Sequence, residues 1–153
     1  MVLDADYVYW IDPAVGDPTL RKTSLDGLSE ELAHVGRAYE LAMDSQYVYW
    51  NDGQDLRRVG LTGGQPSTIA TAVPPGSLAV DASFVYIATT DDPYDGGMVR
   101  AHSIVKVPAG GGTPVTLAST RNPGGLVIDA TSLYWASFVN QGGTVADVMR
   151  LAK

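Results

Sequence analysis

A short segment that occurs four times constrains the fold of this chain more than any other feature. Residues 41–50 read Leu-Ala-Met-Asp-Ser-Gln-Tyr-Val-Tyr-Trp, and similar segments occupy residues 2–10, 78–87 and 126–135. In every copy an aspartate stands five positions before a tyrosine, which gives the pairs Asp4 and Tyr9, Asp44 and Tyr49, Asp81 and Tyr86, and Asp129 and Tyr134. Self-similarity at a period of roughly 40 residues is typical of a repeat architecture. We therefore expect several copies of one structural unit.

Each repeat carries the pattern of four short β-strands. An apolar run leads into the aspartate, which begins a tight turn, and the chain returns in β-branched and aromatic residues such as Val48, Tyr49 and Trp50. A third strand is predicted where a basic residue stands two positions after an aliphatic one, as at Lys22, Arg58, Lys106 and Arg150. A fourth follows a glycine-rich turn. The sequence therefore predicts an all-β fold, a β-propeller of about four consecutive four-stranded antiparallel blades in an incomplete ring.

One segment competes with this prediction. Residues 29–35 are rich in helix formers, and Ser29 could cap a helix there. The register argues against a helix, because a constant distance of twelve residues separates a fourth-strand aliphatic residue from the next aspartate: Leu32 to Asp44, Ile69 to Asp81, and Leu117 to Asp129. A helix in one of three segments of equal length would break the stacking of neighbouring repeats. We predict a strand.

The connections between the second and third strands vary most in length. The distance from Tyr49 to Leu56 is 7 residues, whereas the distance from Tyr86 to Ile104 is 18. In an up-and-down blade these connections emerge on one face together with the blade-to-blade connections, and we call this face the loop face. Insertions confined to one face of a repeat protein mark the side that binds.

The repeats place one domain over the whole chain. We predict a single partial propeller at 1–153, with repeats at approximately 1–38, 39–75, 76–123 and 124–153. A six-bladed ring at this period would need roughly 250 residues. The simplest interpretation is a fragment or a half-ring, whose last predicted strand, Val148–Leu151, presents an open edge. Self-association or missing blades would cover that edge.

The second strands resemble a known family. Residues 9–12 read Tyr-Trp-Ile-Asp and residues 49–52 read Tyr-Trp-Asn-Asp, which resembles the YWTD repeat of six-bladed propellers. The longer pattern is similar to propeller repeats of bacterial cell-envelope proteins related to the YWTD and NHL groups. It runs from Val-Asp-Ala through Val-Tyr-Trp, Lys-Val-Pro and Gly-Gly-Thr-Pro to Leu-Ala. Residues 86–89 and 134–137 depart from the motif, reading Tyr-Ile-Ala-Thr and Tyr-Trp-Ala-Ser. The resemblance implies a propeller and a periplasmic, envelope or secreted location. It implies no single function, since such propellers host binding and several chemistries.

Composition excludes several classes of partner. The formal net charge of −7 argues against nucleic acid and anionic membrane surfaces, because both require a basic patch. The apolar runs are too short to span a membrane, which needs about 20 residues in a row. The chain has no cysteine, so it can form neither a disulfide framework nor a thiolate metal site. No signal-peptide pattern is visible at the start, and the compartment stays open.

The longest loop supplies the first candidate ligand residues. Asp91, Asp92, Tyr94 and Asp95 stand beside two glycines, and carboxylates of this kind can hold Ca²⁺. The spacing does not match the twelve-residue calcium loop, so a solvated loop is the stronger interpretation and ligand contact the alternative. His102 ends this loop and could act as an acid or base, but no partner is visible for it in the sequence.

The repeated residues have structural interpretations. The four aspartates are predicted to form turns, because each occupies the first turn of its repeat. The basic residues of the third strands are predicted to form a solvated or inter-blade ion-pair stripe. The tyrosines and tryptophans of the second strands are predicted to pack between blades.

Two functional hypotheses remain, beside a purely structural spacer. The first is a non-catalytic module that binds a protein or a carbohydrate ligand through the loop face. The second is a fragment of a propeller enzyme of the lactonase or lyase kind, and the resemblance implies that such lactonases hold a metal with side chains from the inner ends of several blades. The corresponding residues here are 39–40, 75–77 and 124–125, among which only Glu40 could ligate. We therefore favour binding, with Glu40 as a candidate contact, and assign no catalytic residue, metal or cofactor.

Overall fold

The computed structural model describes residues 1–13, 17–90, 102–138 and 145–153. These residues form fifteen β-strands in four antiparallel sheets, and no helix occurs among them. Among the same residues, nothing helical is therefore available to cross a lipid bilayer. The predicted all-β architecture is confirmed.

Each sheet is built from consecutive strands. The first contains β1 (Val2–Leu3), β2 (Tyr7–Asp12), β3 (Thr19–Ser24) and β4 (Ser29–His34). The second contains β5 (Leu41–Met43), β6 (Tyr47–Asn51), β7 (Leu56–Gly60) and β8 (Ser67–Ala70). The third contains β9 (Gly76–Val80), β10 (Phe84–Thr89), β11 (Ser103–Pro108) and β12 (Val115–Ser119). The fourth contains β13 (Pro123–Ile128), β14 (Ser132–Phe138) and β15 (Val145–Ala152).

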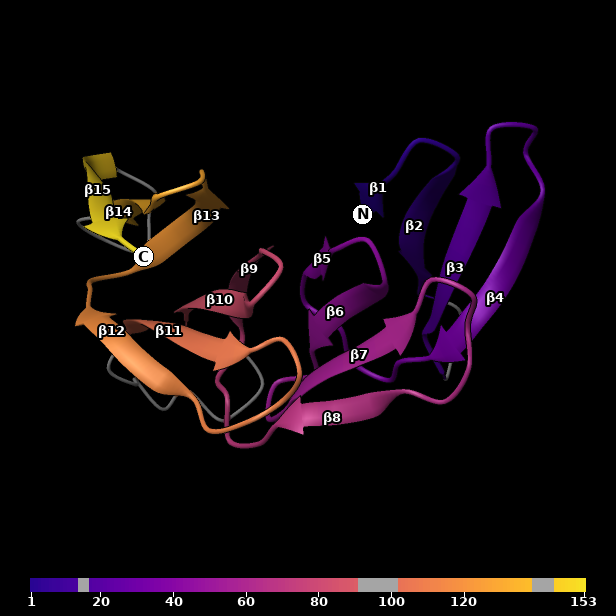
Figure 1. Ribbon diagram of the computed structural model, residues 1–153, viewed down its shortest axis with the longest axis horizontal. Helices are drawn as coiled ribbons and strands as arrows, with labels where there is room; N and C mark the ends of the chain where they lie inside the picture. Colours follow the sequence, from indigo (N-terminus) through magenta and orange to yellow (C-terminus); the bar gives the residue numbers. More distant parts are fainter. Residues whose placement is uncertain (14–16, 91–101, 139–144) are drawn as a thin grey trace.

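The four sheets follow one another around an open arc, as blades of a propeller do (Figure 1). The first strands β1, β5, β9 and β13 line the inner side of the arc, and those of consecutive sheets contact one another. Strands β4, β8 and β12 form the outer rim (Figure 1). The first and fourth sheets lie at separate ends of the arc, so the ring is not closed, as predicted.

The helix-prone segment is strand β4. It pairs with β3 in antiparallel register, with Lys22 opposite Glu30, and Lys22 Nζ lies 2.7 Å from a carboxylate oxygen of that residue. Leu32 is buried, and its backbone carbonyl lies against the turn at Gly63 of the second blade. Packing between blades therefore outweighs the helical preference of the segment, because a strand brings Leu32 into that contact.

The core consists of three layers between consecutive sheets. In each layer the second-strand tyrosine of one blade packs against the second strand of the next blade, as Tyr9 does against Val48 and Trp50. Tyr49 and Tyr86 occupy the same place in the other two layers. Every blade thus has a tyrosine face toward the following blade and an opposite tryptophan face, named after Trp50, toward the preceding one. The predicted packing between blades is confirmed for these residues and for Trp135, whereas Trp10 and Tyr134 are half-buried and belong to none of the three layers.

The fourth sheet differs from the others in having three described strands. Its order is β13-β14-β15, so β15 is an edge strand over the residues that the structure describes. This agrees with the open edge predicted for the last repeat.

Candidate functional site

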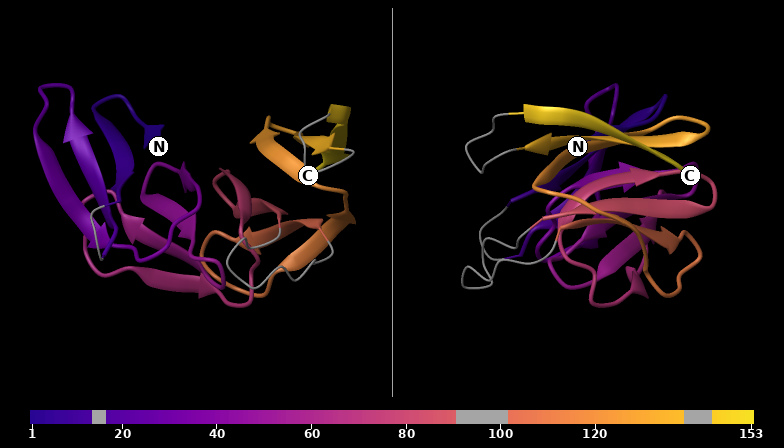
Figure 2. Two further views of the ribbon diagram at one scale, coloured as in Figure 1. Left: turned by 180° about the vertical axis from the view of Figure 1, so that it is seen from behind. Right: turned by 90° about the vertical axis from the view of Figure 1, so that its left-hand side faces the viewer.

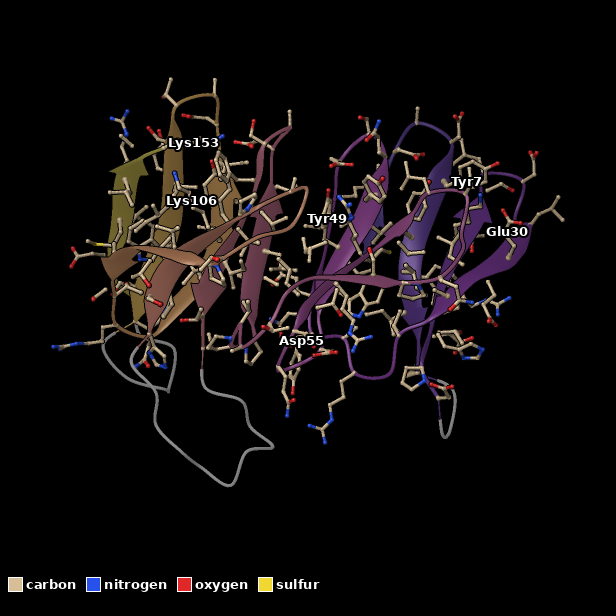
Figure 3. The ribbon with its side chains drawn as sticks, turned by 60° about the horizontal axis from the view of Figure 1, so that its bottom comes forward. Tyr7, Glu30, Tyr49, Asp55, Lys106 and Lys153 are labelled. Atoms are coloured by element: carbon tan, nitrogen blue, oxygen red, sulfur yellow. The ribbon has the colours of Figure 1, made fainter. Side chains whose placement is uncertain are left out.

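The strands run between two faces of the arc, which differ in construction (Figure 2). One face carries the turns between first and second strands, and we call it the turn face. The other is the loop face. Figure 3 shows Tyr7 and Lys153 toward the turn face and Asp55 toward the loop face.

The turn face is built four times in the same way. In the second blade, one carboxylate oxygen of Asp44 accepts hydrogen bonds from the backbone N–H groups of Gln46 at 2.7 Å and Tyr47 at 2.8 Å. The other oxygen accepts a hydrogen bond from the hydroxyl of Tyr49 at 2.7 Å. Asp4, Asp81 and Asp129 repeat this arrangement with the residues at the same spacings. The prediction that the aspartates form turns is confirmed.

Hydrogen bonds and burial shift the pKa values of Asp129 and Tyr49 in these pairs. The backbone N–H of Thr131 and the hydroxyl of Tyr134 lower the pKa of Asp129 to about 2, because they stabilise the charged carboxylate. Burial, together with the carboxylate of Asp44, raises the pKa of Tyr49 to about 12. Asp129 is therefore ionised and Tyr49 protonated at neutral pH.

The basic residues of the third strands join neighbouring blades. Lys22 Nζ donates a hydrogen bond to the backbone carbonyl of Leu61 in the second blade at 3.2 Å. Arg58 Nη1 donates one to the carbonyl of Ala109 in the third blade at 2.6 Å. The inter-blade part of the prediction is confirmed for these two residues. The acceptor across the blades is a backbone carbonyl, however, where an ion pair was predicted.

The loop face carries cavities. Four of them, with volumes of about 590, 340, 370 and 470 Å³, are lined by blade-to-blade connections and by the ends of second strands or the beginnings of third strands. The antiparallel register causes this, since the chain enters each first strand beside the end of its second strand. Thr90 N, for example, donates a hydrogen bond to the carbonyl of Pro75 at 2.7 Å.

One cavity lies where three blades meet on the inner side of the arc, and we call it the inner pocket. Its volume is about 370 Å³. The residues that line it come from the beginnings of β5, β9 and β13 and the end of β10: Tyr39, Glu40, Pro75, Gly76, Ser77, Thr90, Pro123, Gly124 and Gly125. The three segments that the sequence places at the inner ends of the blades are thus brought together.

Among the described residues that line the inner pocket, Glu40 is the only one with a charged side chain. The Ser77 hydroxyl donates a hydrogen bond to Glu40 Oε1 at 3.3 Å and accepts one from the backbone N–H of Leu126 at 3.0 Å. Three blades are therefore connected through one serine. Burial raises the pKa of the Glu40 carboxyl, although hydrogen bonds from Ser77 and the backbone of Leu78 partly oppose this.

Two glycines that line the inner pocket pack closely against a neighbouring strand. A Cβ atom at Gly76 would overlap the backbone carbonyl of Ala88 on the paired strand, and one at Gly124 would lie 2.7 Å from a ring carbon of Phe138. The backbone of β9 therefore packs tightly against that of β10 at Gly76, and the Phe138 ring packs tightly against Gly124. A ligand in this pocket would meet peptide groups, Ser77 and the Glu40 carboxylate.

The two predicted site residues that the structure describes, Glu40 and His102, do not lie together in one site. Asp91, Asp92, Tyr94 and Asp95 lie outside the described residues. His102 stands directly before β11 of the third blade, where its Nδ1 accepts a hydrogen bond at 3.0 Å from the backbone N–H of Asn122, a residue of the connection to the fourth blade. Glu40 lies in the inner pocket, and His102 does not line it.

The pocket contains partners that the sequence analysis did not assign. Ser77 was noted only as part of a strand beginning, and Thr90 was not noted at all. No group of three potential metal-ligating His, Cys, Asp or Glu side chains occurs over residues 1–13, 17–90, 102–138 and 145–153. The sequence offered only one indication of Ser77 as a pocket residue, namely a small hydroxyl side chain directly after Gly76. Whether that hydroxyl lines a pocket depends on which blades meet there.

Comparisons with known proteins place the fold in a class. The sequence matches no protein-family model, and no curated protein is similar to it. Among solved structures, the chain is similar to one in the crystal structure of a nidogen/laminin complex, with a TM-score of 0.68 and 20% sequence identity. The match covers 86% of this chain and 52% of that chain, so this chain spans about half the length of its structural neighbour. That neighbour is a β-propeller. The fold is therefore an open β-propeller.

Proposed function

We propose that this chain is a non-catalytic β-propeller module that binds a protein or carbohydrate ligand through its loop face. The observation that carries the proposal is the difference between the two faces of the arc. The turn face repeats one hydrogen-bonded arrangement in all four blades. The loop face has connections of unequal length and the cavities described above. Variation concentrated on one side of a regular scaffold is how repeat proteins present a binding surface.

The inner pocket is the proposed centre of that surface. It combines glycine-lined backbone, the Ser77 hydroxyl and one partly buried carboxylate, Glu40. Pockets with a few converging polar groups orient a ligand, whereas a metal-dependent reaction would require more ligating side chains than Glu40 alone. The described residues therefore support binding better than the alternative of a lactonase- or lyase-like enzyme fragment.

The resemblance and the structural neighbour support the same proposal. The neighbour comes from a complex between nidogen and laminin, and protein binding is thus one use of a related fold. We further propose that these repeats belong with the YWTD- and NHL-like propellers of bacterial cell envelopes. In the second blade, Asp52 of the motif accepts hydrogen bonds from the backbone N–H groups of Gln54 at 3.1 Å and Asp55 at 2.8 Å, which gives this aspartate a structural role in the turn before β7.

The experiment compares two substitutions of one residue type on opposite faces of the second blade. Gln54 is exposed on the loop face, and Gln46 is exposed on the turn face. The chain is first screened against a displayed peptide library and a glycan array to obtain a binder. We expect Gln54→Arg or Glu40→Gln to weaken binding at least tenfold and Gln46→Arg to leave it unchanged. A binder that is lost with Gln46→Arg and kept with the other two would refute the loop face as the binding side.

A further inference from the structure

The two ends of the arc carry uncovered apolar side chains. Eight large hydrophobic side chains are exposed among the described residues, and seven of them belong to the first or fourth blade: Met1, Leu3, Leu25, Leu28, Val127, Val148 and Met149. The second and third blades, which have a neighbour on both sides, contribute only Val115. Among these seven, Leu3, Val127 and Val148 lie on blade faces that no neighbouring blade of the arc covers.

Comparison with the equivalent residues of the other repeats shows that the tyrosine face of the fourth blade lacks a covering neighbour. Val148 is 75% exposed, while the aliphatic residues that stand at the same position of the other third strands, two places before the basic residue, are completely buried: Leu20, Leu56 and Ile104. Val127 is 59% exposed, and its counterpart Ala42 in the second blade is 6% exposed. The tyrosine face of the fourth blade is thus built like a buried contact.

The tryptophan face of the first blade is the matching half. Leu3 is 67% exposed. Its counterparts in the other three blades, which pair with the residue before the tyrosine, pack into the layer shared with the preceding blade: Met43, Val80 and Ile128. The first blade therefore presents an uncovered tryptophan face, which is the kind of surface that covers a tyrosine face inside the arc.

We propose that a second copy of this chain covers these faces in a head-to-tail contact, with the tyrosine face of one fourth blade against the tryptophan face of the other copy's first blade. The contact is of the kind that each chain makes three times internally. One chain cannot make it by itself, because its two ends lie apart (Figures 1 and 2). Unlike surfaces meet in such an interface, so it is heterologous.

A polar contact follows from the same equivalence. Lys22 and Arg58 each donate to the carbonyl of the residue directly after the third strand of the next blade. Arg150 is the basic residue at this position in the fourth blade, and Leu25 is the residue after the third strand of the first blade. In the head-to-tail contact, the Arg150 guanidinium of one copy would donate to the Leu25 carbonyl of the other.

The loop face stays open in this arrangement, so the inference is independent of the ligand proposed above. The association would instead extend that face by placing two arcs side by side. It would also cover the apolar side chains that would otherwise remain in water.

The test uses two variants that each block one end. Leu3→Asp blocks the first blade and Val148→Asp the fourth, and both side chains are mostly exposed, so the fold should tolerate the changes. In sedimentation velocity over a hundredfold dilution series, we expect the unmodified chain to form species larger than a monomer as concentration rises. Each variant alone should stay monomeric, whereas an equimolar mixture should form a complex of two chains and nothing larger, because each variant retains one opposite free face.

The control is Val115→Asp, which changes an exposed valine of the third blade and should associate like the unmodified chain. Circular dichroism verifies the β-structure of every variant, and Arg150→Glu replaces Val148→Asp if the latter does not fold. An unmodified chain that is monomeric at all concentrations would overturn the inference. So would a mixture of blocked variants that stays monomeric, or association that neither substitution affects.

Discussion

Removal of the Asp44 carboxylate is expected to destabilise the second blade strongly. Asp44 accepts three hydrogen bonds, two from the turn backbone and one from Tyr49, whose side chain is completely buried. A hydrogen bond to a charged group contributes about 1.5–3 kcal/mol, and a buried hydroxyl left without a partner costs about 1–3 kcal/mol. Water replaces part of the turn contacts in Asp44→Ala. We therefore expect a loss of about 3 kcal/mol in the free energy of unfolding, or about 6–12 °C in Tm.

The fourth blade supplies the matched control. Asp129 accepts the same set of hydrogen bonds, but both it and its bond to Tyr134 are exposed to solvent. Asp129→Ala should therefore cost clearly less than Asp44→Ala in urea unfolding at one fixed protein concentration. Equal losses for the two substitutions would refute the reasoning, because burial of the tyrosine would then have no influence.

A double-mutant cycle isolates the bond between the two side chains. Asp44→Ala, Tyr49→Phe and the double variant should give a coupling energy of about 1–2 kcal/mol, and the corresponding cycle for Asp129 and Tyr134 a smaller one. Coupling near zero in the second blade would mean that the aspartate acts through the turn backbone only. In that case the fixed spacing of aspartate and tyrosine would have no energetic basis.

The same pair predicts a loss of stability in alkali. Burial and Asp44 raise the pKa of Tyr49 to about 12 from its usual value of 10.0. A group whose pKa is raised by folding contributes stability below its unfolded pKa, and this contribution disappears as the pH rises through the folded pKa. We therefore expect stability to fall between about pH 10 and pH 12, together with tyrosinate absorption near 295 nm. Tyrosinate that forms fully near pH 10 while the chain stays folded would contradict the assignment.

Two further predictions concern single buried positions. The indole N–H of Trp50 is buried without a hydrogen-bond partner, whereas the equivalent Trp135 donates to the hydroxyl of Thr120 in the blade before it. Val35 occupies the position of Thr120 relative to Trp50, so a threonine there could accept the missing hydrogen bond. Val35→Thr should therefore lower the free energy of unfolding, measured in urea, by at least about 1 kcal/mol less than Val73→Thr, the same substitution at a buried site without an indole, and equal losses would contradict this. Gly76→Ala should destabilise by about 3 kcal/mol or more, because its methyl group would overlap the backbone of β10, whereas Gly60→Ala, with its nearest neighbour at 3.6 Å, should have little effect in thermal unfolding.

Local sequence was sufficient to predict the strands and their order. Each blade is encoded by short-range information: the aspartate binds backbone two and three residues later, and the tyrosine five residues later returns to it across one hairpin. Such contacts do not depend on the rest of the molecule, so four copies of the pattern predict four copies of the structure. The register between repeats also predicted β4 correctly as a strand, although residues 29–34 alone favour a helix.

The tertiary structure decided which residues meet. Ser77 binds both Glu40, 37 positions earlier, and Leu126, 49 positions later. This combination depends on the angle between blades and on the side of the arc to which each strand beginning points, and neither is written in the periodicity. Val148 also depends on tertiary structure. It occupies the same position in its repeat as the buried Leu56, but it is 75% exposed because no further blade of the arc covers it. Repetition fixes the unit, whereas the number of neighbours each unit has determines which of its surfaces become core, pocket or interface.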